Sequence, residues 1–188
     1  IDIEEDDGTS KEHLIDGPML AAMLTGSVVS PNYDVASPWT RRKLIGPSQL
    51  ARTLDAVQQN QLAQAGVTVL DDKPPFIRVR HGLTTDMTSI LTKTPTVRLI
   101  ADHVQQQSRS TLDQFIGLKF LPGVLSQVEG RLAKMFQTLV KQQIIAIYTG
   151  LKAQVDAEDP TTANVEAFYQ PVFPLLYIVL TFHLRASL

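Results

Sequence analysis

The sequence lacks cysteine altogether, so no disulfide, thiolate metal site or cysteine nucleophile is possible in this chain. It also lacks an apolar run of about 18 residues, the length that a membrane-spanning helix requires. Neither sign of charge predominates, because 17 Lys and Arg oppose 19 Asp and Glu for a formal net charge of −2. That balance argues against a general nucleic-acid binder, which usually carries a basic stripe.

The motifs of the common enzyme classes are missing as well. There is no glycine-rich phosphate loop, no H-E-x-x-H and no G-x-S-x-G. The histidines lie in four separate predicted elements, at His13, His81, His103 and His183. The acidic run at residues 4–7 lacks the alternating ligand spacing of a calcium loop. The sequence therefore singles out no catalytic or metal site. A small enzyme or ligand-binding domain whose residues converge only in three dimensions stays an alternative.

What is present fits a soluble globular protein. The chain has 188 residues, of which 44% are hydrophobic and 19% charged, so we expect one domain plus an extension. The first residues are acidic and include neither an initiating Met nor an apolar signal core. We therefore expect the chain to be processed or, in preference, to be a piece of a longer protein.

Hydrophobic periodicity predicts the secondary structure. Helices are expected at 18–25, 48–65, 94–115 and 122–148, with Gly150 ending the last, and strands at 67–70, 76–80 and 151–155. A short element at 161–169 is not assigned to either type. The element order predicts an α+β fold in which two long helices pack on one face of a small mixed sheet.

Residues 39–43 combine an aromatic side chain with a small group of cations. We interpret Trp39 as a packing anchor beside Pro38 rather than a ligand-stacking platform. Arg41, Arg42 and Lys43 fit a solvated turn better than a phosphate or partner patch.

Residues 175–185 predict a final, unusually long strand. They contain no Gly, Pro or acidic residue and are rich in the residue types that favour strands. One alternating face is entirely apolar and consists of Leu176, Ile178, Leu180, Phe182 and Leu184. At about 3.3 Å per residue the strand would span roughly 36 Å, about twice the usual length. Such a strand is an aggregation hazard unless it is paired, so we expect it to pair with another molecule in a self-assembling structural protein.

Several segments, in this order, resemble the C-terminal part of a contractile-tail sheath protein of a bacteriophage. The segments are AGVTVL at 65–70, FIRVRHGLTTD at 76–86, FLP at 120–122 and PLLYIVLTFHL at 174–184, preceded by GPMLAAMLTG and SPWTRRKLIG. The resemblance implies three regions. Residues 1–46 would be the end of a larger preceding domain with a linker, 47–174 the C-terminal sheath domain, and 175–188 a strand or arm.

The resemblance implies a mechanical function without catalytic residues, metal or cofactor. Subunits would form a helical stack of rings around a tail tube and contract to drive the tube through the host envelope during genome ejection. Arms would link the subunits by strand donation, or β-augmentation. Implied partners are further copies, the tail tube protein, the baseplate and the tail terminator, with no nucleic-acid contact and no membrane insertion. The protein would be made in the bacterial host cytoplasm and reside in the virion tail.

We assign the subunit interface to two strands. The donating strand is expected to use Leu176, Ile178, Leu180, Phe182, Leu184 and Arg185. The receiving strand is expected to use Ile77, Arg78, Val79 and Arg80. Another tail or baseplate protein stays an alternative because rings and helices can share one interface. The sheath of a secretion system or a tailocin would look similar.

Overall fold

The structure is a computed structural model that describes residues 2–4, 10–12, 14–29, 33–47, 49–121, 123–176 and 178–181. Its α-helices are α1 (Gly17–Val29), α2 (Ala56–Gln64), α3 (Pro95–Leu112) and α4 (Val124–Lys141), and the 3-10 turn η1 (Asp113–Phe115) follows α3. Its strands are β1 (Asp2–Glu4), β2 (Ser10–Glu12), β3 (Val69–Lys73), β4 (Phe76–His81), β5 (Ile145–Val155) and β6 (Ala163–Pro171). The α+β class is confirmed.

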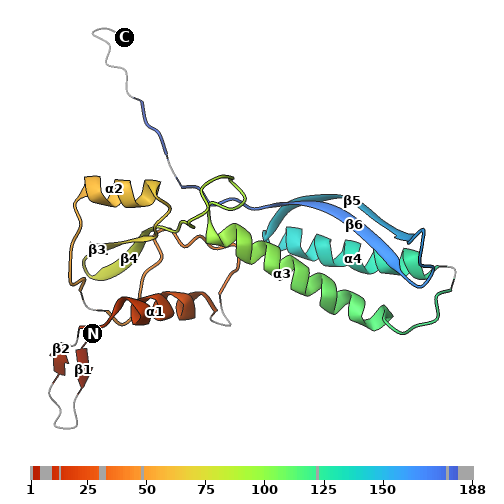
Figure 1. The fold of residues 1–188 in the computed structure, drawn as a ribbon, viewed down its shortest axis with the longest axis horizontal. Helices are drawn as coiled ribbons and strands as arrows, with labels where there is room; N and C mark the ends of the chain where they lie inside the picture. Colours follow the sequence, from red (N-terminus) through yellow and green to blue (C-terminus); the bar gives the residue numbers. More distant parts are fainter. Residues whose placement is uncertain are drawn as a thin grey trace, which may run out of the picture.

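The described strands form three separate antiparallel hairpins, β1–β2, β3–β4 and β5–β6. The predicted mixed sheet is therefore wrong in detail. The helices α3 and α4 separate the two larger hairpins along the chain, and each hairpin pairs within itself. Figure 1 shows α1, α2 and β3–β4 at one side of the molecule, and α3, α4 and β5–β6 at the other.

The main core lies between α3, α4 and the β5–β6 hairpin. Each element contributes buried side chains to one cluster, including Ile100, Val104, Leu132, Phe136, Leu139, Ile145 and Ala153. The Phe136 ring of α4 stacks on Tyr148 of β5 with a centroid distance of 5.0 Å. The expectation that two long helices cover one face of a sheet is thus confirmed, with β5–β6 as the sheet.

The predicted helix 122–148 is too long, because α4 ends at Lys141. Gln143 has a positive φ of 59°, which turns the chain back, and β5 begins at Ile145. The β-branched residues that widened the apolar stripe favour a strand here. Gly150 does not end the helix as predicted; it lies inside β5 with a φ of 66°.

Two other predicted boundaries also change. The helix expected at 48–65 begins only at Ala56, because Asp55 and Gln58 form a reciprocal capping box that fixes the start of α2. The short element at 161–169 is strand β6. The predicted helix at 18–25 is present as α1, and the predicted hairpin is β3–β4, which turns at Pro74 and Pro75.

Residues 41–44 run beside β4 and form backbone hydrogen bonds with the edge of β4 that does not face β3. The Arg41 amide donates to the Val79 carbonyl at 2.6 Å, and the Val79 amide donates to the Arg42 carbonyl at 2.8 Å. The Leu44 amide donates to the Ile77 carbonyl at 2.8 Å. In the described part of the chain, no helix has the length and apolar character to cross a membrane.

Candidate subunit interface

The C-terminal segment (residues 172–188) contains the predicted donating strand. Its described residues form no strand within this chain. Leu175, Ile178, Val179 and Leu180 are between 71% and 88% exposed, and Leu176 is half-buried. Phe182, Leu184 and Arg185 lie outside the described residues. Figure 1 shows the described part of the segment, residues 172–176 and 178–181, leaving β6 and extending away from α3 and α4. Its apolar side chains on both alternating faces are thus available to another molecule.

The predicted receiving strand, β4, is already paired along both edges. One edge pairs with β3, where Arg78 lies opposite Asp71, and the other pairs with residues 41–44. Ile77 and Val79 are fully buried, and Arg78 forms an ion pair with Asp71 at 3.3 Å. Arg80 donates to Gln59 and, at 3.0 Å, to Asn60 of α2. At Ile77 and Val79 the backbone therefore has no open edge in the single chain.

The outer edge of β6 is open and regular. In the described residues, β6 pairs only with β5. The pairing shifts twice, between Ile145 and Ile147 and between Thr149 and Lys152, and both times β5 contributes the extra residue. A bulged strand is bent and leaves a residue unpaired, which blunts its edge, whereas β6 continues without insertions. Within the β5–β6 hairpin, β6 is therefore the better template for an added strand.

A cavity lies between helix α3, helix α4 and the face of β6 that packs on them. Its volume is about 280 Å³, and its lining includes Val104 and Ser108 of α3 with Val165, Ala167 and Tyr169 of β6. Burial is the main cause that raises the pKa of the Tyr169 hydroxyl, and the negative charge of Asp102 adds to it. The helices thus leave part of the inner face of the β5–β6 hairpin uncovered at β6.

An apolar groove continues from the start of β6. It has a volume of about 570 Å³ and lies between the end of α3, the loop 116–121, the start of α4 and the first residues of β6. Among the described residues, its lining contains no charged side chain and includes Phe115, Ile116, Leu118, Phe120, Val128 and Val165. Ile116 is 79% exposed, although it is apolar. We call this surface the end groove.

The solvent face of α4 is cationic. Arg131, Lys134 and Lys141 are all exposed on this helix. Its single acidic residue, Glu129, is half-buried and accepts a hydrogen bond from the Ala153 amide at 2.7 Å. The predictions from the sequence did not include this face, although residues 131, 134 and 141 recur at helical spacing. The face is suited to an acidic protein surface.

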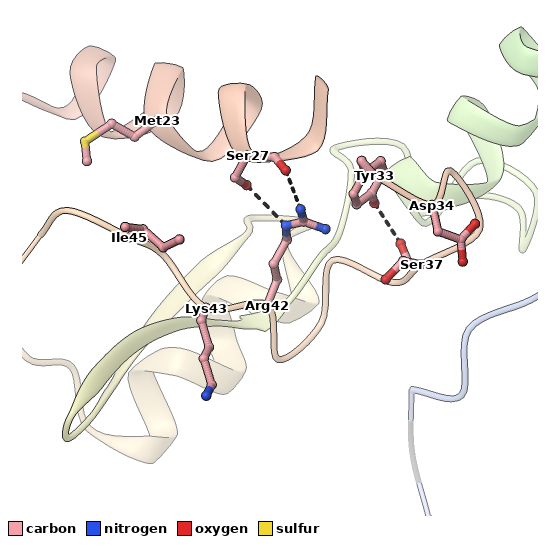
Figure 2. Close-up of a pocket in the computed structure, with 8 residues that line it drawn as sticks. All are labelled: Met23, Ser27, Tyr33, Asp34, Ser37, Arg42, Lys43 and Ile45. Carbon is pink, nitrogen blue, oxygen red and sulfur yellow. Dashed lines mark hydrogen bonds between the residues drawn. The ribbon is translucent and has the colours of Figure 1, made fainter. Parts of the chain in front are cut away.

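Figure 2 shows a second kind of site, a pocket of about 650 Å³ between α1 and residues 33–45. The Arg42 guanidinium spans it: Nε donates to the Ser27 hydroxyl at 3.2 Å and a terminal nitrogen donates to the Ser27 carbonyl. The same guanidinium lies 4.2 Å from the centre of the Tyr33 ring. Burial raises the pKa of Tyr33, with a smaller contribution from Asp34, while Arg42 opposes the rise.

These contacts change the interpretation of Arg41, Arg42 and Lys43 as a solvated turn. Arg41 and Lys43 are exposed, as in a solvated turn, but Arg42 is half-buried and ties the last turn of α1 to the edge of β4. Trp39 is a packing residue, since a Cβ on Gly82 would lie only 2.4 Å from the Trp39 Cβ. We call this contact region the Arg42 junction and assign it a structural role.

No family model matches the chain. The chain is 29% identical over 176 residues, 92% of its length, to the "Tail sheath protein" of Mycobacterium phage Bxz1. Its fold matches the contracted helical sheath of the anti-feeding prophage with a TM-score of 0.75 and 15% identity, over 97% of this chain and 53% of that one. It also matches a chain of the anti-feeding prophage baseplate with a TM-score of 0.72 and 16% identity, over 88% of this chain and 49% of that one.

The fold is therefore similar to that of chains from the contracted sheath and the baseplate of the anti-feeding prophage. The resemblance to contractile-tail sheath proteins is confirmed by the similarity in sequence and in fold. The chain covers 30% of the length of the phage protein and about half of the two solved chains. In the described residues, no group of three or more His, Cys, Asp or Glu side chains could hold a metal ion.

Proposed function

We propose that the chain is part of a sheath subunit that polymerises around a tail tube and contracts to drive the tube through a host envelope. The observation that carries this proposal is the similarity to a phage tail sheath protein across 92% of the chain. The exposed apolar C-terminal segment supports it, because a self-assembling subunit provides a second copy to bury that surface. The location would then be the virion tail, after synthesis in the host cytoplasm.

The C-terminal segment of one copy adds a strand to the outer edge of β6 in a neighbouring copy. Main-chain hydrogen bonds would supply the affinity and alternate side chains the register. Antiparallel pairing is the commoner arrangement. We choose the register that places Ile178 opposite Glu166, so that Val179 lies opposite Val165 and faces the cavity beside α3.

On the outer face of the hairpin, the same register brings Leu176 opposite Phe168. Phe168 is 67% exposed in the single chain, and Ile147 is also exposed on β5. Apolar cross-strand pairs stabilise sheets by roughly 0.2–1 kcal/mol each. A one-residue slip would turn Val179 to the outer face of the hairpin and Leu176 to the inner face. The placement of Val179 at the cavity and of Leu176 opposite Phe168 therefore disfavours that slip.

The cationic face of α4 is our candidate contact for the tail tube. Arg131, Lys134 and Lys141 would meet an acidic surface, and such contacts weaken as salt rises. During contraction each subunit would move nearly as a rigid body while its C-terminal segment stays paired. Pro171 and Pro174 at the root of the segment restrict the torsions available there. The baseplate and the tail terminator would contact the two ends of the stack.

Electron microscopy of the full chain under assembling conditions tests the sheath proposal. Long hollow tubes are expected from the full chain, and none from a variant that lacks residues 176–188. Tubes of normal length from that variant would overturn strand donation. The match to a baseplate chain supports a second candidate, a baseplate component, which predicts closed rings of fixed number instead of tubes.

A further inference from the structure

We propose that the cavity between α3, α4 and β6 receives the Tyr177 side chain of a second copy. This inference rests on the strand addition proposed above and deepens it, because it names the side chain of the C-terminal segment that enters the neighbouring copy. In an extended segment, Tyr177 shares its face with Leu175 and Val179, and the face of Leu176 lies opposite. Tyr177 would therefore act as the specificity-determining residue of the added strand.

The cavity opens toward the outer edge of β6. On the side of α4 it is closed by Leu132 and Phe136, which are both buried. On the side of α3 its lining includes Gln105, which is exposed, and Ser108, which is half-buried. Because α4 packs on β5 and α3 packs on β6, the exposed side of the cavity lies where a strand added to β6 would run.

Helix α3 and strand β6 run in opposite directions. Ala101, in the first half of α3, lines the cavity together with Tyr169 near the end of β6. Leu112, the last residue of α3, lines the end groove together with Ala163, the first residue of β6. A segment that pairs antiparallel with β6 therefore runs parallel to α3, and its inner-facing side chains pass along the cavity.

The register chosen above brings Tyr177 to the cavity and matches side chains by size. Tyr177 lies opposite Ala167, which belongs to the cavity lining. The inner-facing neighbours of Ala167 on β6 are the larger Val165 and Tyr169. The largest inner-facing side chain of residues 175–181 thus meets a small one, as in a well-packed core. A two-residue shift would keep the faces but place Tyr177 against Val165 or Tyr169, so the size match disfavours it.

The cavity has room and suitable chemistry for a tyrosine. Its volume is about 280 Å³, and apolar cavities of about 150 Å³ already bind benzene. Val104 and Phe136 offer apolar contacts to the ring. The Gln105 side chain, at the exposed side, can accept a hydrogen bond from the Tyr177 hydroxyl. The polar end of the tyrosine would then not be buried without a partner.

Disulfide cross-linking of the full chain tests the inference, since the sequence contains no cysteine of its own. Donor copies carry Ile178→Cys, with or without Tyr177→Ala. Receiver copies carry Glu166→Cys, with or without Ser108→Phe, whose ring would fill the cavity from within the receiving copy. Each donor is mixed with each receiver under assembling conditions. Donors and receivers have tags of different mass, so that the mixed dimer can be counted on a non-reducing gel.

The parent pair should give the mixed dimer readily. Either added substitution should lower its yield about tenfold, because Tyr177→Ala leaves the cavity empty and Ser108→Phe leaves the tyrosine no room. Together they should restore part of the yield, because the introduced ring fills the space that the tyrosine vacates.

The four mixtures separate failure of the inference from failure of strand addition. An unchanged yield with either substitution, or two losses that simply accumulate in the double mixture, would overturn the inference and leave strand addition standing. Absence of the mixed dimer from the parent pair would overturn strand addition and the inference together.

Two control variants and a melting experiment distinguish the cavity from general effects. Tyr177→Phe keeps the ring and should retain most of the cross-linking. Ser110→Phe places the same ring at an exposed position of α3 outside the cavity lining and should leave the yield unchanged. Ser108→Phe should not lower the melting temperature of the receiver. A lower value would show that the cavity has no room for a ring and would overturn the inference, as would equal yields from the two serine variants.

Discussion

The Phe168 ring lies directly over Gly150 on the outer face of the β5–β6 hairpin. A Cβ at position 150 would stand 2.8 Å from Phe168 Cδ2, and Gly150 has a φ of 66°. Both the close approach and the left-handed backbone require glycine here. The contact holds the aromatic ring beside the position where the register places Leu176 of a neighbouring copy. Gly150, at the bulge in β5, is therefore in direct contact with Phe168, which belongs to the proposed interface.

Gly150→Ala is expected to destabilise the chain by about 1–2 kcal/mol from the left-handed backbone alone, with more from the contact with Phe168. Gly130→Ala is the matched control, since Gly130 lies in α4 with no atom within 4 Å of an added Cβ. That substitution should stabilise the helix by roughly 0.5–1 kcal/mol. Urea unfolding measures both, and a stabilising Gly150→Ala would contradict the described backbone.

Phe136→Ala should be among the most destabilising single substitutions. Phe136 is buried in α4, where its ring stacks on Tyr148 and lies 6.3 Å from Tyr169. Removing a buried phenylalanine costs about 3–5 kcal/mol. Met135→Ala on the neighbouring, partly buried position should cost less. A thermal melt that ranks Met135→Ala as the more damaging change would contradict the assignment of the core.

Because the Arg42 junction holds the last turn of α1, we expect a substitution of Arg42 to loosen α1 selectively. Arg42→Lys keeps the charge, but an ammonium lacks the planar fork of donors that reaches both oxygens of Ser27. Amide hydrogen exchange in the last turn of α1 should therefore accelerate, with little change in α4. Arg41→Lys, at an exposed position, serves as the control. Equal exchange in the two variants would show that the guanidinium does not hold the helix.

The sequence predicted the parts of the fold that depend on local pattern. Helical periodicity placed α3 and α4, and the alternation at 76–80 placed β4. The C-terminal part of the predicted second long helix was wrong because the apolar stripe continues into β5, where β-branched residues change its period from helix to strand. The left-handed backbone of Gln143 marks the change from helix to strand. A glutamine does not indicate a left-handed backbone, so the residue type gave no warning of this turn.

The sequence alone describes one half of the candidate interface better than the other, for a physical reason. The exposed apolar segment could be recognised from its own residues, since it has no charge before His183. The receiving edge depends on which backbone groups remain unpaired after folding, and residues 41–44 pair with β4 across a separation that no local pattern reports. The bulges that distinguish β6 from β5 are likewise properties of a pair of strands.

Phe182→Asp should impair assembly more than Arg185→Ala. In the proposed register, Phe182 continues the apolar face of Leu176, Ile178 and Leu180, which lies on the side of the exposed Phe168, so a carboxylate there would interrupt an apolar contact between copies. Arg185 belongs to the other alternating face and lies beyond the end of β6, where losing a charge costs little. Sedimentation velocity across a concentration series compares the two variants with the parent chain. Because Phe182 and Arg185 belong to the proposed arm, we expect the thermal melts of the two variants to match, so that any difference in assembly reports the contact between copies. Equal loss of assembly would contradict the face assignment of the segment.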